Sequence, residues 1–172
     1  MLTMWLNQPH LSPHYMQGPI TRSEVDDKFL PRTQDGSAVR CLVAETEGTP
    51  FGYLQWYFNR SFPDDSAAAA GETDGVSVDY YIGHPDFLGR GLGVAMLTAC
   101  RHSLHALLRQ PDRRLFIQHS DGNLAARRCT EAAGFRLLKD FSRNGDRYLL
   151  YHASPIEAGA PPDNSSIRRR LS

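Results

Sequence analysis

The sequence predicts an α+β domain in which one mixed sheet carries helices on its faces. Residues 76–82 alternate an apolar set with a set that contains Ser77 and Asp79, which is the period of a β-strand. A glycine-rich turn, Gly89-Arg90-Gly91-Leu92-Gly93, then opens a helical run. Residues 113–119 are predicted as a second strand after that helix. Two strands joined in this way are expected to be parallel, with a right-handed crossover.

The first half of the chain predicts short helices and a hairpin. Residues 1–20 indicate a short helix end followed by a loop. Thr21-Arg22-Ser23-Glu24 is a capping-box pattern, and it predicts a helix that ends at Pro31. Residues 38–45 and 51–58 are strand-like runs around a Glu47-Gly48-Thr49-Pro50 turn, which predicts a hairpin. Residues 59–75 are polar and small, and we expect a mobile loop there.

The second half predicts a helix over residues 123–133, with Gly134 where a left-handed residue often ends a helix. Residues 135–141 and 147–152 predict a closing hairpin around Arg143-Asn144-Gly145-Asp146. From residue 155 the chain is rich in Pro, Ala, Gly, Asn and Ser. We therefore expect one domain over residues 1–154 and a disordered tail over residues 155–172.

Composition narrows the functional classes. A hydrophobic content of 41% and a charged content of 22% are ordinary for a globular protein, and the zero net charge argues against nucleic acid as a partner. No apolar run reaches the roughly 20 residues of a membrane span, and no signal pattern opens the chain. The three cysteines lie in apolar contexts, which indicates thiols in a reducing compartment and a cytoplasmic protein. His102 and His105 have no further ligands at suitable spacing, so no metal is predicted.

The glycine-rich turn suits an anion, because glycines let backbone N–H groups converge at a helix N-terminus with its partial positive charge. No Gly-Lys-Ser/Thr follows it, so it is not a Walker loop. The glycine spacing does not match a dinucleotide fingerprint either. Phosphate binding and a plain tight turn both remain open from this segment alone.

Two segments carry a family resemblance. Residues 79–93, from Asp79 through the glycine turn, resemble the acetyl-CoA-binding motif of the GNAT N-acetyltransferase superfamily, and Asn123-Leu124-Ala125-Ala126 with Glu131-Ala132-Ala133-Gly134-Phe135 follow at the right distance. Within the superfamily the chain is similar to aminoglycoside 6′-N-acetyltransferases. The supporting segments are Trp5-Leu6-Asn7, Phe29-Leu30-Pro31 and Gly52-Tyr53-Leu54-Gln55. The resemblance covers residues 5–152.

The resemblance implies a mostly antiparallel sheet whose central parallel strand pair splays apart for acetyl-CoA. The pantetheine arm would lie along the strand, the pyrophosphate on the amides of the turn, and the strand N–H near Ile82 would polarise the thioester carbonyl. The implied cofactor-binding residues are Tyr81, Ile82, Leu88, Gly89, Arg90, Gly91, Leu92, Gly93, Val94, Asn123 and Ala126. For Asn123, plain N-capping is the alternative role.

Asp79 is the implied catalytic residue. It lies on the polar face of the predicted strand, just ahead of the cofactor segment, where it could hold an ammonium ion and accept its proton directly or through water. An ordinary aspartate, with a pKa of ~3.9, is a poor base at neutral pH, so burial or a proton relay must help. The alternative is a solvent-facing strand aspartate.

Further residues are candidates for contact with a polycationic substrate. The set, which again contains Asp79, is Tyr15, Trp56, Tyr57, Glu72, Asp74, Asp79 and Asp121. The aromatic members are expected to form a wall against sugar rings, with core packing as the alternative. The acids at 72 and 74 belong to an acidic loop that also holds Asp64 and Asp65, with a solvated surface loop as the alternative.

The chain departs from the family at three places. The family usually has a strand and most of a helix before the Trp5 segment, whereas this chain starts at Met1. The turn after the second strand is short, so His119, Ser120 and Asp121 compete for the place of a second substrate aspartate. Thr130 stands where many relatives have a tyrosine that is thought to protonate the departing sulfur.

The sequence therefore predicts an acetyl-CoA-dependent transfer to an aminoglycoside amine, most naturally the 6′-amine, giving antibiotic resistance. One alternative is a GNAT acyltransferase for another amine, such as a siderophore hydroxylysine or a polyamine. A second alternative is a non-catalytic acyl-CoA-binding module. The protein is expected to be a monomer or a homodimer, because a short sheet leaves an edge to cover.

Overall fold

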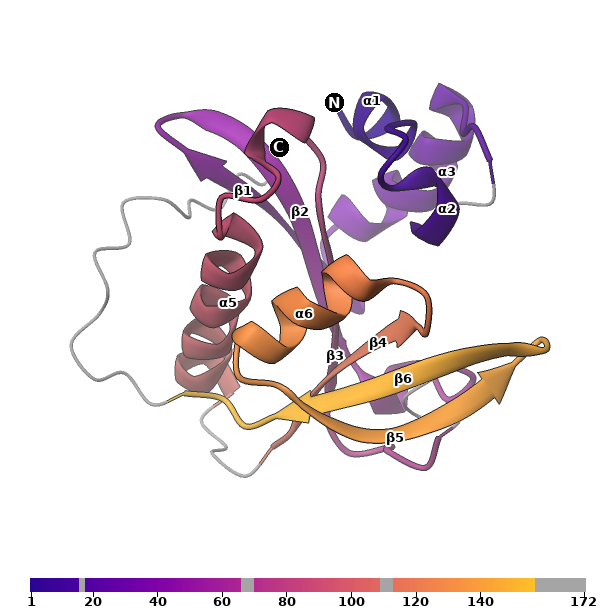
Figure 1. Cartoon of the computed structure of the whole chain (residues 1–172), viewed down its shortest axis with the longest axis vertical. Helices are drawn as coiled ribbons and strands as arrows, with labels where there is room; N and C mark the ends of the chain where they lie inside the picture. The colour runs from indigo at the N-terminus through magenta and orange to yellow at the C-terminus, as the bar shows by residue number, and fades with distance from the viewer. Residues whose placement is uncertain (16–17, 66–69, 109–112, 157–172) are drawn as a thin grey trace.

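The computed structural model describes residues 1–15, 18–65, 70–108 and 113–156. A single six-stranded sheet forms the centre of the molecule, with strand order β1-β2-β3-β4-β6-β5 (Figure 1). The strands are β1 (Val39–Thr46), β2 (Thr49–Phe58), β3 (Val76–Ile82), β4 (Leu115–Ser120), β5 (Arg136–Arg143) and β6 (Asp146–Ala153). All neighbouring strands are antiparallel except β3 and β4. The predicted mixed, mostly antiparallel sheet is confirmed.

Both predicted hairpins form, and their turns explain the boundaries. Glu47 and Gly48 have φ angles of 49° and 76°, and Asn144 and Gly145 have 52° and 86°. Two consecutive residues with positive φ give a type I′ turn, whose twist matches that of the flanking strands. The first hairpin turn is therefore two residues long, and β2 begins at Thr49 instead of Phe51.

The helices are α1 (Leu2–Leu6), α2 (Ser12–Tyr15), α3 (Arg22–Thr33), α5 (Leu92–Leu108) and α6 (Leu124–Ala132), with 3₁₀ turns at Asn59–Ser61 and Pro85–Phe87. The capping box is confirmed, because the Thr21 side chain accepts from the Glu24 N–H while the Glu24 carboxylate accepts from the Thr21 N–H. The predicted end at Pro31 is wrong: α3 continues to Thr33. In the last turn of a helix, a proline removes only one terminal hydrogen bond.

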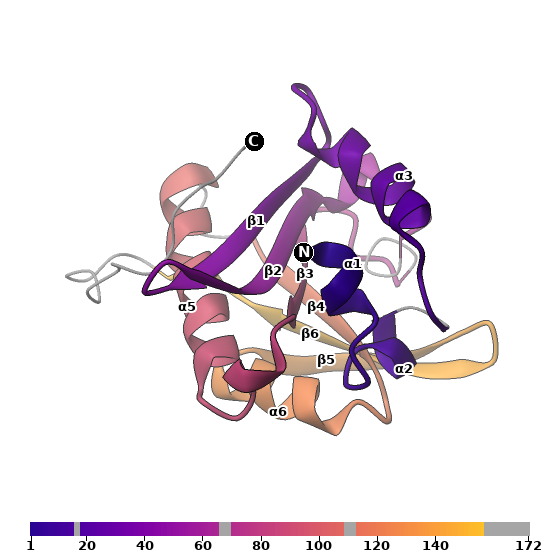
Figure 2. The same cartoon turned by 90° about the horizontal axis from the view of Figure 1, so that it is seen from above.

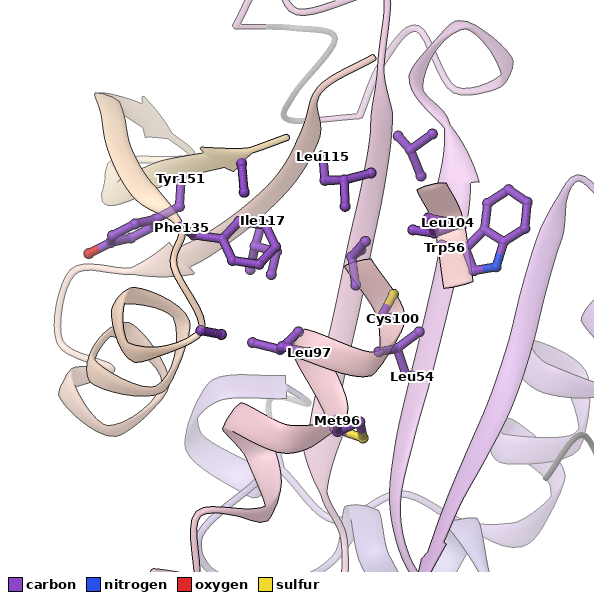
Figure 3. Close-up of a cluster of buried hydrophobic side chains, with 14 of the residues drawn as sticks. Leu54, Trp56, Met96, Leu97, Cys100, Leu104, Leu115, Ile117, Phe135 and Tyr151 are labelled. Atoms are coloured by element: carbon purple, nitrogen blue, oxygen red, sulfur yellow. The ribbon is translucent and has the colours of Figure 1, made fainter. Parts of the chain in front are cut away.

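Strand alternation divides the core into two layers. The even-numbered side chains of β3 face α5 and α6 and join a large cluster that includes Leu54, Leu97 and Ile117 (Figure 3). The odd-numbered side chains lie on the opposite face, where Tyr81 stacks on Tyr53 and joins the α1 and α3 side chains. Figures 1 and 2 show these two helical layers apart, with α1, α2 and α3 away from α5 and α6.

The parallel pair β3–β4 stays together over two residue pairs, Val76–Leu115 and Ser77–Phe116, and then separates. The Val76 N–H donates to the Arg114 carbonyl at 3.0 Å, so the even-numbered residues of β3 direct their backbone groups toward β4. Beyond the last pair, the Val78 carbonyl and the backbone groups of Tyr80 and Ile82 therefore point into the gap between the strands. The splay that the resemblance implied is present.

Two predicted features lie outside the described residues, at least in part. The predicted mobile loop over residues 59–75 includes residues 66–69, and the predicted tail over residues 155–172 includes residues 157–172. Residues 66–69 and 157–172 are not among the described ranges. Among the helices that the structure describes, none has the length and apolar character needed to cross a membrane.

A glycine at the end of β3 provides a test of how α1 docks. A Cβ at residue 83 would overlap the indole ring of Trp5, whose side chain is buried. Gly83→Ala should therefore lower the free energy of unfolding by about 1–3 kcal/mol, the usual cost of overpacking. Gly122→Ala is the control, because a Cβ there meets nothing within 4 Å. Urea unfolding measures both, and a loss of equal size in the two variants would contradict the docking argument.

Candidate active site

The gap between β3 and β4 opens into a pocket of about 630 Å³. Its lining comes from β3, the glycine turn with the start of α5, the end of β4, α6, and the N-terminal residues His10, Leu11 and His14. A smaller cavity, too narrow for a water molecule, adjoins it on the face of the sheet that carries Ser77. Asp79 and Gln118 line both cavities, so they lie at the junction between them.

The glycine turn presents open backbone at the start of α5. Gly89 and Gly91 have φ angles of 71° and 74°, are exposed, and have nothing within 4 Å of an added Cβ. The first N–H groups of a helix have no intrahelical partner, so those at the start of α5 are available to a ligand. Gly93 has a different role, because a Cβ there would lie 2.7 Å from the Cys129 Sγ. It allows α5 and α6 to approach each other closely.

Most of the predicted cofactor-binding residues meet at this pocket. Those among its lining are Tyr81, Ile82, Leu88, Gly89, Gly91, Leu92, Gly93, Val94, Asn123 and Ala126. Arg90 is exposed and lies over the Phe87 ring at 5.4 Å from its centroid, outside the lining. The Asn123 Oδ1 accepts the Ala126 N–H at 3.2 Å, so Asn123 is an N-cap that also borders the pocket.

The open edge of β3 is partly engaged by the N-terminal segment. The Nε2 atom of His10 lies 2.8 Å from the Ile82 carbonyl oxygen. A carbonyl only accepts, so this nitrogen carries the proton. Tyr81 borders the pocket, but its side chain is buried in the opposite layer and its backbone faces β2, so it offers no group to this edge.

Asp79 is held at the junction of the two cavities by Gln55, whose Nε2 donates to the Asp79 Oδ2 at 2.7 Å. Burial raises the pKa of Asp79 above that of an ordinary aspartate. The hydrogen bond from Gln55 acts in the opposite direction, as do the positive charges of Arg32 and Lys28, whereas the negative charge of Asp65 adds to the rise. A carboxyl group with a raised pKa accepts a proton more readily at neutral pH.

Thr130 is fully buried and links two pocket residues. Its Oγ1 lies 2.7 Å from the His119 Nε2 and 3.0 Å from the Tyr80 hydroxyl, which also donates to the Ala126 carbonyl. Tyr80 and His119 line the pocket, and Thr130 is not among the lining residues. Burial, with a smaller effect from the Arg127 charge, lowers the pKa of His119 to about 4, so this imidazole is neutral at neutral pH.

The aromatic candidates for substrate contact occupy different places. Trp56 packs in the core on the α5 side, edge-on to Phe58, and is not part of the pocket lining. Tyr57 borders the smaller cavity, where its hydroxyl donates to Asp65 at 3.0 Å. Tyr15 belongs to α2, and its side chain lies outside the described part of the chain.

The acidic candidates other than Asp79 form ion pairs within the chain. Glu72, Asp74 and Asp121 each have a basic partner at 2.8–3.4 Å, and none of the three belongs to the described lining of the pocket. Their partners include Arg114 for Glu72, Arg113 for Asp74, and Arg127 and Arg147 for Asp121. Paired carboxylates have less negative charge to offer an incoming cation.

Several residues in or beside the pocket had no clear signal in the sequence. Gln55 appeared only within the Gly52-Tyr53-Leu54-Gln55 motif, although a polar residue in a strand that is otherwise buried is itself a signal. Gln118 has the same signal in β4. His14 and Tyr148 reach the pocket from distant parts of the chain, which no local pattern could predict. No described cluster of three or more His, Cys, Asp or Glu residues could hold a metal ion.

Known proteins are similar to this chain in sequence and in fold. The family model for the acetyltransferase (GNAT) domain matches residues 1–143. The aminoglycoside N(6′)-acetyltransferases type 1 of Klebsiella pneumoniae and Serratia marcescens are each 28% identical over 138 residues, which is 78% of this chain and 67% of theirs. The structure of AAC(6′)-Ib with coenzyme A and kanamycin is 23% identical, covers 90% of this chain and 87% of its own, and has a TM-score of 0.72, which shows a shared fold.

A further solved relative, aminoglycoside N-acetyltransferase AAC(6′)-Ib11, is 25% identical with a TM-score of 0.65, over 90% of this chain and 89% of its own. The family match extends over most of the described residues, and it includes the splayed strands, the glycine turn and α6. The chain therefore belongs to the GNAT acetyltransferase family.

Proposed function

We propose that this protein transfers an acetyl group from acetyl-CoA to an amine of an aminoglycoside, at the 6′ position, and thereby confers resistance. The observation that carries the proposal is the continuous pocket from the glycine turn, along the open edge of β3, to Asp79. The names of the curated relatives support the acceptor, and solved structures of AAC(6′)-Ib with kanamycin and with ribostamycin support it further. The three free cysteines support a cytoplasmic location.

The residues of the pocket fit acetyl-CoA. The exposed N–H groups after Gly89 and Gly91 suit a pyrophosphate, since they combine with the positive end of α5. The Val78 carbonyl, both backbone groups of Tyr80 and the Ile82 N–H suit the amides of a pantetheine arm, which would take the place of the missing β4 partner. A solved structure of AAC(6′)-Ib that holds acetyl-CoA supports this assignment.

The chain supplies the groups that transfer requires. Acetyl-CoA provides an activated acetyl group in the form of a thioester. The acceptor amine arrives as an ammonium ion, and Asp79 holds it and takes its proton, aided by the raised pKa of the carboxyl. The Ile82 N–H donates to the carbonyl oxygen that gains negative charge. A free thiol has a pKa of about 8.5, so the CoA thiolate leaves readily near neutral pH and takes a proton from water.

A specific observation favours a second candidate, transfer to an amine with fewer charges. Glu72, Asp74 and Asp121 are paired with basic residues of the chain itself. Asp79 is then the acidic residue at the described pocket lining, and Asp65 borders the smaller cavity. The smaller cavity is too narrow for a substrate, and a single carboxylate suits a small amine as well as a polycation.

Turnover of acetyl-CoA tests these candidates directly. The purified protein is assayed with kanamycin, with polyamines and with simple monoamines, and release of the CoA thiol is followed. The proposal expects the highest kcat/KM with kanamycin. Preference for a small amine would support the second candidate, and CoA binding without turnover would indicate a non-catalytic module.

The glycine turn is tested by Gly91→Asp, which places a side chain and a negative charge in the anion site. Calorimetry should show the CoA affinity falling at least about tenfold, since repulsion and the loss of donors each cost ~1 kcal/mol or more. Gly48→Asp is the matched control, because its φ of 76° is close to the 74° of Gly91 and it lies in the β1–β2 turn. Equal CoA affinity in folded Gly91→Asp and wild type would remove the turn from the site.

Asp79→Asn tests the proposed base. It should lower kcat by about 10²- to 10⁴-fold, the usual contribution of a general base. In the wild type, kcat/KM should fall as the pH drops through the pKa of Asp79, which burial raises, because the protonated carboxyl cannot accept a proton. Steady-state kinetics from pH 5 to 9 measure both effects. The exposed Asp35→Asn is the control, and a kcat near wild type in Asp79→Asn would make Asp79 a bystander.

Thr130→Ala separates packing from catalysis at the α6 network. We expect the free energy of unfolding to fall by about 1–3 kcal/mol, because His119 and Tyr80 lose a buried partner. We expect kcat at saturating acetyl-CoA to stay within about fivefold of wild type, roughly 1 kcal/mol of barrier. A loss of about 100-fold that Thr130→Ser restores would instead assign the hydroxyl to the proton transfer.

A further inference from the structure

We propose that Gln55 is a positioning residue that orients the Asp79 carboxylate and keeps it ionised, and that Arg32 and Tyr53 fix Gln55 in that role. The proposal rests on the proposed function, because the role of Asp79 belongs to it. Gln55 faces Asp79 directly across the β2–β3 ladder. The amide of Gln55 is therefore built into the sheet beside the carboxylate.

The chemistry of its partners determines how the Gln55 amide points. The Arg32 Nη1 lies 2.6 Å from one end of the amide, and a guanidinium can only donate, so that end is the oxygen. The Tyr53 hydroxyl lies 2.8 Å from the same atom. The other end is then the nitrogen, which donates to the Asp79 Oδ2 at 2.7 Å. Because Arg32 and Tyr53 both donate to the Gln55 oxygen, the amide nitrogen must face Asp79.

Burial makes this arrangement rigid. Gln55 is 5% exposed and Tyr53 is 2% exposed, so water cannot substitute for either hydrogen bond. Arg32 comes from the last turn of α3 and lies over the Phe29 ring, which anchors the guanidinium from the helical side. A positive charge on α3 therefore acts on a carboxylate of β3 through one neutral amide.

The amide changes the proton affinity of Asp79. An N–H donor stabilises the carboxylate and not the carboxylic acid, so its removal raises the pKa of Asp79 further. The other charged or titratable groups that act on Asp79 or respond to it are Arg32 and Lys28 from α3, Asp65 from the loop after β2, and Tyr57 from β2. Without Gln55, Asp79 would remain protonated at a higher pH and could not accept the proton of the amine.

Two substitutions separate orientation from packing. Gln55→Met keeps the side-chain length but has no N–H donor. Gln55→Glu keeps an acceptor for Arg32 and Tyr53, so the fold is maintained, but it presents oxygen to Asp79. Gln34→Met is the matched control, since Gln34 is the exposed C-cap residue of α3.

The pH profile of kcat/KM is measured for wild type and all three variants. In Gln55→Met the acidic limb should move up by about one to two pH units, the effect of losing one hydrogen bond to a charged group. Gln55→Glu should move it at least as far, with the KM for acetyl-CoA unchanged in both. Gln34→Met should follow the wild-type profile. A fall of equal size at every pH, with the limb in place, would give Gln55 a purely structural role and overturn the proposal.

A second readout does not depend on activity. The pKa of Asp79 is measured by carbon NMR of its carboxyl in wild type and in Gln55→Met without any substrate, with Asp79→Asn to assign the signal. A rise of about one to two units in the variant supports the positioning role, and an unchanged pKa overturns it. If the wild type acetylates no amine in the panel, the proposed function fails, and the NMR comparison still decides whether Gln55 controls Asp79.

Discussion

The separation of β3 from β4 after two residue pairs is the constraint on which the rest of the structure depends. A sheet interior normally satisfies its backbone groups in ladders, and an unpaired buried N–H or C=O costs free energy. Here the edge of β3 is left open, and the N-terminal residue His10 occupies the Ile82 carbonyl. The sheet is held together instead by its two antiparallel halves, β1–β2–β3 and β4–β6–β5. The open edge can then accept a ligand as if it were another strand.

Each face of the sheet carries one polar network beside this gap. The face toward α3 carries Asp79 with its chain of donors through Gln55 to Arg32. The face toward α6 carries Thr130 between Tyr80 and His119. In each network a pocket residue is hydrogen-bonded to a buried polar residue, which is Gln55 for Asp79 and Thr130 for Tyr80 and His119. Polar groups that are satisfied in this way are stable inside a low-dielectric core and keep a fixed orientation.

Much of the fold could be predicted from local patterns. The site could be predicted only in the part formed by β3 and the glycine turn at residues 89–93. The alternation of residues 76–82, the capping box at Thr21 and the Asn144-Gly145 turn each determine a local geometry, and each is present. The end of α3 was misplaced, because Pro31 lies in the last turn, where a proline removes only one terminal hydrogen bond. Local patterns also cannot tell which carboxylates are neutralised by distant arginines, as Asp121 is by Arg147 across 26 positions. Local patterns also do not show which face of β2 is covered by α5, so they could not identify Trp56 as a core residue and Tyr57 as a residue at the cavity.

The packing of the N-terminal helices has a consequence for the order in which the molecule can assemble. The cluster around Trp5 and Phe29 is completed by Tyr53 and Tyr81, which follow much later in the chain. During synthesis α1 and α3 leave the ribosome before β2 and β3, so their apolar sides stay uncovered until those strands emerge. Contacts between residues so far apart in sequence form slowly, because the intervening chain must first be ordered. The N-terminal wall of the pocket can therefore close only after the central strands β2 and β3 exist.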